Sequence, residues 1–161
     1  MDNNNQFVIF KIQEEDFGVE IINVREIIKP QQILKVPNTP KYIEGIINLR
    51  GKVHPVFNLR KKFHFEQKDF DERTKIIIVN VNSIDVGFIV DDVSEILRIE
   101  EQNMETPPNI IMGHHRKYIR NVGKIANRMI IILDLNLILS EDEEKELKEF
   151  IKLKHSHSEN K

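Results

Sequence analysis

The sequence contains the segment GVEIINVREII at residues 18–28, and a related segment, GFIVDDVSEIL, recurs at residues 87–97. The two segments align without gaps at an offset of 69 residues and keep Gly, Val and Glu at the same places. Residues 42–63 and 118–139 match in the same way at an offset of 76 residues. Two blocks in register and in the same order argue against a chance agreement of apolar patterns. The chain therefore contains an internal repeat.

The composition predicts a mostly β protein. Ile and Val are abundant and Ala126 is the only alanine, and β-branched residues fit a pleated surface better than a helix. Each half of the repeat is too small to bury a good core alone, so the halves should pack as a pair. We expect one domain over residues 7–154, made of two related small β-barrel lobes that divide near residues 65–75. Strands can be exchanged between the lobes.

Alternating apolar residues predict the individual strands. Residues 24–28 fit a strand and a helical turn equally well, and residues 100–116 should form an irregular connection. Pro55 cannot donate to a ladder, so its strand should be an edge or carry a bulge there. The clear strands are expected at residues 7–12, 17–21, 45–49, 53–58, 75–81 and 84–90.

The C-terminal segment is predicted to be a helix. Ser140 and Glu143 form a capping box, acidic residues follow at once, and Leu147, Phe150 and Ile151 make one apolar stripe. Beyond Lys154 the polar residues 155–161 are expected to be a disordered tail.

The absence of cysteine excludes a disulfide scaffold and a Cys-ligated metal site, and the balanced charge argues against a nucleic-acid-binding protein. The formal charge of the 161 residues is −2, with the two signs interspersed, and there is no cysteine. This pattern does not suggest the strong positive potential that binding to nucleic acid requires. The basic groups at residues 60–62 and 114–117 raise that alternative, but few aromatic side chains are available to stack on bases. The polar N-terminus lacks the plan of a signal peptide, and we expect a cytoplasmic protein without membrane insertion.

No catalytic motif is present, so we expect neither an enzyme nor a cofactor. The sequence has no Gly-x-Ser-x-Gly elbow, His-Glu-x-x-His pair or phosphate loop. Asp91-Asp92 with Glu95 could bind Mg²⁺, but a solvated strand end explains these acids better. His114-His115 and His155-x-His157 have no carboxylates at useful spacing, so we predict surface histidines and no metal site.

Arg50 stands out in the turn Asn48-Leu49-Arg50-Gly51. It has no nearby acid in sequence, and its repeat counterpart is Ala126, so the fold does not require an arginine there. Pattern alone leaves two interpretations open, a solvated turn residue and a guanidinium presented rigidly to a partner.

Four segments together resemble the CheW family of chemotaxis adaptors. They are FVIF at residues 7–10, residues 17–27, the signature VPNTPKYIEGIINLRGKVHPVFNLR at residues 36–60, and residues 86–97. The resemblance implies two five-stranded SH3-like barrels and no enzymatic activity. It also implies binding to the regulatory domain of the histidine kinase CheA and to the cytoplasmic hairpin tip of chemoreceptors. With its charge nearly balanced, the protein alone is expected to be a monomer. The protein would then be cytoplasmic and recruited to receptor arrays.

The resemblance also implies a set of contact residues and one departure. Asn121 stands where the second half of the family usually has Gly; because Asn tolerates positive φ, we expect the turn to be kept. The alternative function is a CheW-like module of a larger signalling protein of the CheV type. The residues expected to contact kinase or receptor are Val24, Glu26, Gly45, Asn48, Arg50, Gly87 and Ile96.

Overall fold

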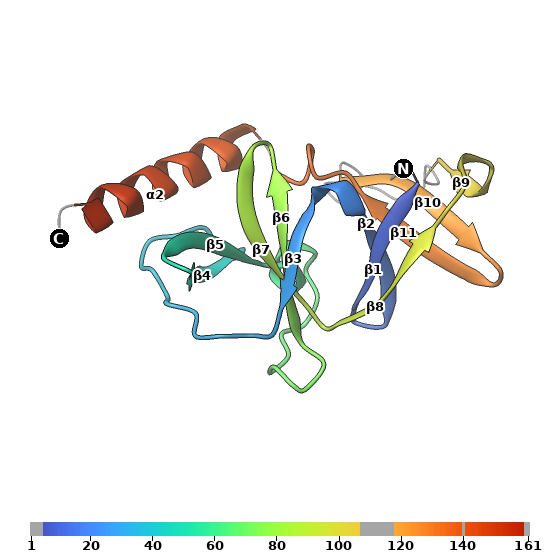
Figure 1. Ribbon diagram of the computed structural model, residues 1–161, viewed down its shortest axis with the longest axis horizontal. Helices are drawn as coiled ribbons and strands as arrows, with labels where there is room; N and C mark the ends of the chain where they lie inside the picture. The colour runs from blue at the N-terminus through green and yellow to red at the C-terminus, as the bar shows by residue number, and fades with distance from the viewer. Residues whose placement is uncertain (1–4, 107–117, 140, 160–161) are drawn as a thin grey trace.

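The computed structural model describes residues 5–106, 118–139 and 141–159, which form strands arranged in two lobes and a long C-terminal helix (Figure 1). The strands are β1 (Gln6–Ile12), β2 (Glu15–Glu20), β3 (Val24–Ile28), β4 (Ile43–Leu49), β5 (Lys52–Asn58), β6 (Lys75–Val81), β7 (Ile84–Val90), β8 (Asp92–Arg98), β9 (Met104–Glu105), β10 (Ile119–Ile125) and β11 (Arg128–Leu133). The helices are α1 (Leu59–Lys62) and α2 (Glu141–Glu159), with 3₁₀ turns at Ile21–Asn23 and Glu101–Asn103.

Strands that are equivalent in the repeat follow one another in the same order in the two sheets. Lobe A has the order β8-β1-β2-β11-β10-β9, and lobe B has the order β3-β6-β7-β5-β4. In each lobe the third and fourth strands are parallel and their neighbours are antiparallel. The predicted mainly β fold, with two repeat-related five-stranded lobes and a C-terminal helix, is confirmed. The two-residue strand β9 is an addition to lobe A.

The halves of the repeat do not coincide with the lobes. Lobe B takes all its strands from one continuous segment, residues 24–90. Lobe A combines β1 and β2 from the start of the chain with β8, β10 and β11 from its second half. Lobe B is thus inserted between the second and third strands of lobe A, and the chain crosses between lobes at Ile21–Asn23 and again at Asp91.

Strands β1 and β6 are buried on both faces because each lies between its own lobe and the other. Val8, Phe10 and Ile12 of β1 enter a core shared by both lobes, whereas Phe7 and Ile9 enter a core within lobe A. Strand β6 alternates in the same way between the shared core and a core within lobe B. Burial on both faces explains why both strands read as nearly continuous apolar runs.

The structure decides one prediction that the sequence left open, at residues 24–28, and contradicts another, at Pro55. Residues 24–28 form strand β3, after a single 3₁₀ turn. The prediction for Pro55 is wrong, because β5 is a central strand between β7 and β4. Pairing with β7 begins only at Val56, so no donor is needed at Pro55 on that side. The bulge in the β4–β5 pair lies near Glu44.

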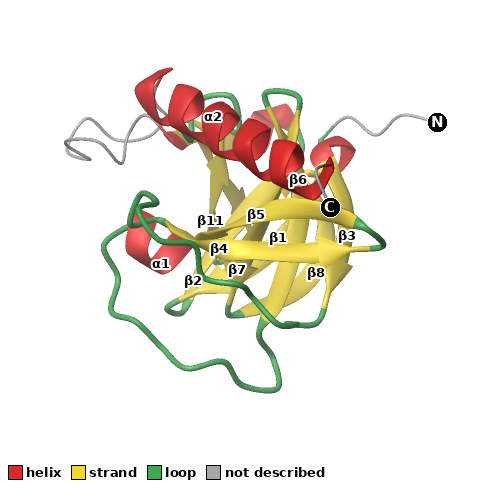
Figure 2. Cartoon of the chain, turned by 90° about the vertical axis from the view of Figure 1, so that its left-hand side faces the viewer, coloured by secondary structure: helices red, strands yellow, loops and turns green. Residues whose placement is uncertain are grey.

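Helix α2 lies along one side of the strands in both views (Figures 1 and 2). Leu147 is fully buried in the shared core, and Ile151 packs against it. The helix continues to Glu159, so the boundary predicted at Lys154 lies too early; no Pro or Gly occurs in residues 141–161 to end it. Ser140 of the predicted capping box lies outside the described residues. No helix in the described part of the chain is long and apolar enough to cross a membrane.

Candidate protein-interaction surface

Strands β3 and β8 are repeat equivalents, and each lies at the end of its sheet. Each carries a bulge at the same repeat position, where Arg25 of β3 and Ser94 of β8 have no partner in the neighbouring strand. Both strands lie on the same side of the molecule, which faces the viewer in Figure 1 (Figures 1 and 2). Bulges at sheet edges redirect side chains and stop further strand pairing. This face is therefore built to present side chains, not backbone.

Each edge strand exposes one isoleucine at the same repeat position. Ile96 of β8 is 55% exposed and Ile27 of β3 is 40% exposed. Val24 is only half-buried, but it packs against the shared core, as does its counterpart Val93. Of the two predicted apolar contacts, Ile96 is available to a partner, whereas Val24 mainly supports the strand. Ile27 was not among the predicted contact residues, although it lies at the position that the 69-residue offset pairs with Ile96.

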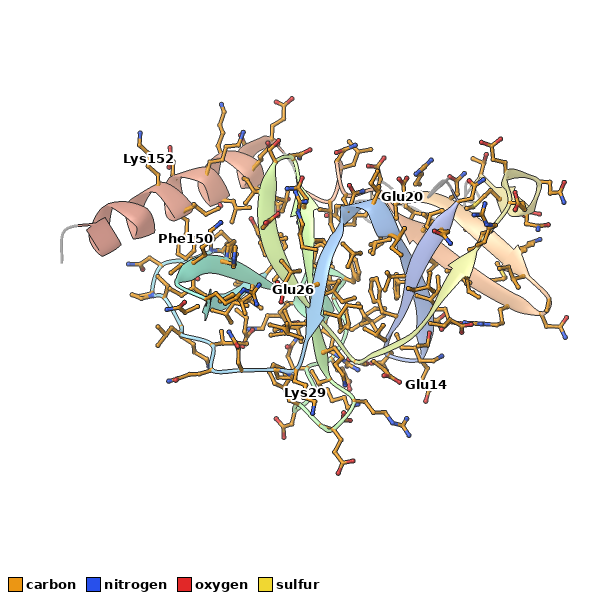
Figure 3. All side chains as sticks on the ribbon, in the orientation of Figure 1. Glu14, Glu20, Glu26, Lys29, Phe150 and Lys152 are labelled. Atoms are coloured by element: carbon orange, nitrogen blue, oxygen red, sulfur yellow. The ribbon has the colours of Figure 1, made fainter. Side chains whose placement is uncertain are left out.

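Glu26 and Arg50 are brought together at this face. The Arg50 guanidinium donates to both carboxylate oxygens of Glu26, with Nη1 at 3.3 Å from Oε1. Figure 3 shows Glu26 on β3, with Lys29 just after the strand, on the face turned to the viewer. The Arg50 side chain is 73% exposed, so much of the guanidinium remains open to a partner. The structure thus supports a restrained arginine rather than one that points freely into solvent.

The second lobe contains a related ion pair. Nη1 of Arg128 donates to Oε2 of Glu95 at 2.9 Å, and the same guanidinium reaches Oδ2 of Asp16 at 3.3 Å. Glu95 is the repeat counterpart of Glu26, but Arg128 stands two residues after Ala126, the counterpart of Arg50. The fold therefore pairs the repeated glutamate with an arginine in both lobes. Ala126 stands at the position equivalent to Arg50, but Arg128 supplies the arginine of this pair from two residues further along.

The hairpin that carries Arg50 is fixed by Asn48. The Asn48 side-chain oxygen accepts a hydrogen bond from the Gly51 backbone N–H at 2.9 Å, and its carbonyl accepts one from Gln31. Arg50 has φ 51° and Gly51 has φ 86°, as a two-residue hairpin turn requires. Ala126 has φ 53° in the equivalent turn. Asn48 is exposed, but its bonded oxygen serves the turn.

Gly45 and Gly87 are buried, so direct contact with a partner is closed to them in this structure. A Cβ at Gly45 would lie 2.2 Å from the carbonyl oxygen of Leu34, and one at Gly87 would lie 2.8 Å from Cγ2 of Ile76. Neither glycine has positive φ, and neither has Asn121. The expectation that Asn121 preserves a positive-φ turn is therefore wrong. Gly45 is required by the close approach of Leu34.

Asp91, one of the acidic residues considered for Mg²⁺, is instead paired with Arg60. Asp91 accepts hydrogen bonds from Nε of Arg60 at 3.0 Å and from the backbone N–H of Gln13 at 2.8 Å. Burial alone would raise the pKa of Asp91, but these bonds outweigh it and hold the pKa below its ordinary value. In the described part of the chain, no group of three or more His, Asp or Glu side chains could hold a metal ion. His114 and His115 lie outside the described residues.

Comparison with known proteins identifies the family. Residues 6–143 match the family model of the CheW-like domain. Chemotaxis protein CheW of Treponema pallidum (strain Nichols) is 31% identical over 150 residues, which cover 91% of this chain and 88% of that protein. Chemotaxis protein CheW of Klebsiella aerogenes is 33% identical over 138 residues, covering 86% and 83%. The crystal structure of scaffolding protein TtCheW from Thermoanaerobacter tengcongensis matches with a TM-score of 0.78 and 36% identity, over 86% of this chain and 90% of that one. The chain belongs to the CheW-like domain family.

Proposed function

We propose that this protein is a non-enzymatic chemotaxis adaptor that couples the histidine kinase CheA to the cytoplasmic tips of chemoreceptors. The observation that carries the proposal is the repeated edge-strand face. Strands β3 and β8 each carry an exposed isoleucine that directly follows, in sequence, a glutamate paired with an arginine, so one chain offers two related edge strands to partners. An adaptor needs two such surfaces to hold two partners at once. Similarity to proteins described as chemotaxis and scaffolding proteins supports the same function.

The chemistry of this face suits protein partners. Ile27 and Ile96 supply apolar anchors, and the surrounding charges form a polar rim, the usual arrangement of a protein interface. Such interfaces concentrate their binding energy in a few side chains. Because Glu26 holds the Arg50 guanidinium, less side-chain entropy is lost when Arg50 donates to a partner.

The proposed contact residues have different roles. Ile96, Glu26 and Arg50 are assigned to direct contact, together with the newly identified Ile27. Val24 and Asn48 hold the edge strand and the hairpin in place. The remaining pair, Gly45 and Gly87, allows close packing behind the face.

The proposal includes the state and location of the protein. In this proposal the protein is a monomer when alone, lies in the cytoplasm, and is recruited to membrane receptor arrays through its partners. It needs no cofactor and does not bind nucleic acid. Retention on heparin that falls steeply with salt would favour the nucleic-acid alternative.

Reconstitution tests the function directly. The purified chain is mixed with CheA and with a receptor signalling fragment from the same cell, separately and together. We expect binding to each partner, and kinase activation only when all three are present. If the chain binds neither partner, or if the kinase is equally active without it, the proposal is wrong.

A further inference from the structure

Lys62 is a buried cation at the junction of the lobes. It ends α1, and its side chain is only 5% exposed. Its repeat counterpart is Ile138, a fully buried aliphatic residue of the shared core. The first half therefore has an ammonium where the second half has a core side chain. Lysine is rarely buried without a specific partner, so this difference requires an explanation.

Three elements converge on the Lys62 ammonium. Its nitrogen lies 4.5 Å from the ring centroid of Tyr42 and 5.2 Å from that of Tyr118. It also donates to Oε2 of Glu143 at 2.6 Å. Tyr42 directly precedes β4 of lobe B, Tyr118 directly precedes β10 of lobe A, and Glu143 lies in the first turn of α2. One cation thus contacts both lobes and the helix.

The two tyrosines are repeat equivalents held in the same way. The Tyr42 carbonyl accepts from the Asn58 N–H at 2.7 Å, and the Tyr118 carbonyl accepts from the Asp134 N–H at the same distance. The backbone that carries each ring is therefore tied to its own lobe, at the last residue of β5 for Tyr42 and at the residue after β11 for Tyr118. A cation between two anchored aromatic rings is attracted to both, and more strongly where water is excluded. Moving either lobe would weaken one of these contacts.

We propose that Lys62 is a positioning residue that locks lobe A, lobe B and α2 in one arrangement. Resting on the proposed adaptor function, this lock sets the spacing between the two edge strands, and so lets one chain hold kinase and receptor together. The specific requirement is for a positive charge at this position. A role in packing alone would be served equally well by an unbranched apolar side chain.

Lys62→Met separates these roles, because methionine keeps an unbranched side chain and removes the charge. Lys62→Arg keeps the charge and should restore the lock. The matched control is Lys61→Met, which removes the neighbouring lysine; that lysine is exposed and pairs with Glu44. Glu143→Gln weakens the helix side of the lock without altering the core, and it is used if Lys62→Met does not fold.

Distances between the lobes provide the readout. The chain has no cysteine, so spin labels at Lys52→Cys and Asn127→Cys report one site on each lobe. We expect Lys62→Met to broaden the distance distribution and to accelerate amide exchange in residues 141–152 by about tenfold. Lys62→Arg and Lys61→Met should match the parent protein. Glu143→Gln should accelerate exchange in α2. An unchanged distribution and unchanged exchange in Lys62→Met, or in Glu143→Gln where that variant replaces it, would overturn the proposal.

A second measurement separates this inference from the proposed function. Unlabelled Lys62→Met should bind kinase and receptor fragments singly with affinities within about twofold of the parent, while kinase activation in the three-component mixture falls at least about tenfold. A parent protein that binds neither partner refutes the adaptor function but leaves the measured lobe arrangement standing. Normal activation by a variant with broadened distances would refute the link between the lock and coupling.

Discussion

Arg50 and Glu26 join opposite ends of one sheet. Glu26 lies on β3, the first strand in the order of lobe B, and Arg50 lies in the turn between β4 and β5, at the other end of that order. The sheet must curl for these side chains to meet. The ion pair therefore lies across the seam of the lobe and also at the surface that we assign to partners.

Arg50→Ala is expected to leave the melting temperature within a few degrees. The Arg50 side chain is largely exposed, and exposed ion pairs contribute little to stability. The same change should abolish kinase activation in the reconstituted mixture, because the guanidinium is the directed donor of the proposed contact. Calorimetry and a kinase assay measure the two effects.

Arg128→Ala extends the test to the related pair in lobe A, which belongs to the second proposed surface. If Arg50→Ala causes a large loss of thermal stability while coupling stays intact, Arg50 belongs to the scaffold. Equal loss of activation in both variants would mean that both pairs are contacts.

Ile27→Asp and Ile96→Asp should each weaken binding to kinase or receptor. Both side chains are exposed, so the variants should fold, and a buried carboxylate at an interface hot spot costs about 2 kcal/mol or more. Titration calorimetry with each partner measures the loss. Met129→Asp changes another exposed apolar residue of lobe A and serves as the control. Normal affinity of both isoleucine variants for both partners would place the interface elsewhere.

Gly45→Ala is expected to lower the free energy of unfolding by more than about 2 kcal/mol. The new methyl carbon would lie 2.2 Å from the Leu34 carbonyl oxygen, and the Leu34 segment would have to leave β4. Gly51→Ala is the control, because nothing lies within 4 Å of its new Cβ. Its φ of +86° should cost about 1 kcal/mol. Chemical denaturation that ranks Gly51→Ala as the more harmful change would contradict this account.

Asp91→Asn should destabilise the protein by about 2 kcal/mol at neutral pH, because the pair with Arg60 is largely but not fully shielded from water. The folded-state pKa of Asp91 lies below its ordinary value, so the ionised carboxylate stabilises the fold above that value. This contribution is lost as the pH falls through the folded-state pKa. The difference between parent and variant should therefore shrink below about pH 4.

Unfolding measured from pH 7 to pH 3 tests the Asp91 prediction. The adjacent Asp92→Asn should change stability by less than about 0.5 kcal/mol at neutral pH. A difference between parent and Asp91→Asn that stays constant across the range would show that the stabilisation does not depend on the charge of Asp91.

The repeat made the architecture and the possibility of strand exchange predictable, but not which strands the lobes exchange. Matching segments such as residues 18–28 and 87–97 define equivalent strands. They do not say which copy of a strand completes which sheet, because either pairing satisfies the same apolar pattern. The pairing of β1 with β8 and the parallel contact of β2 with β11 decide this.

The candidate surface was predictable where a residue acts alone. Ile96 and Arg50, two of the expected contact residues, are both exposed. The partner of Arg50 was not predictable, because Glu26 lies 24 residues away and the contact depends on the curl of the sheet. The reason for Gly45 was hidden as well, since Leu34 reaches it through an isolated bridge between Leu34 and Ile46.

The insertion of lobe B within lobe A dictates an order of assembly during synthesis. Residues 24–90 contain every strand of lobe B, so this lobe can close while the ribosome is still making the rest of the chain. The β1–β2 hairpin emerges first but must wait for Ile130–Ile132 of β11 before its sheet is complete. Pairing across such a long sequence separation is slow. During that interval the nascent chain displays an unpaired apolar hairpin, which makes the earliest strands the natural site for chaperone binding or misassembly.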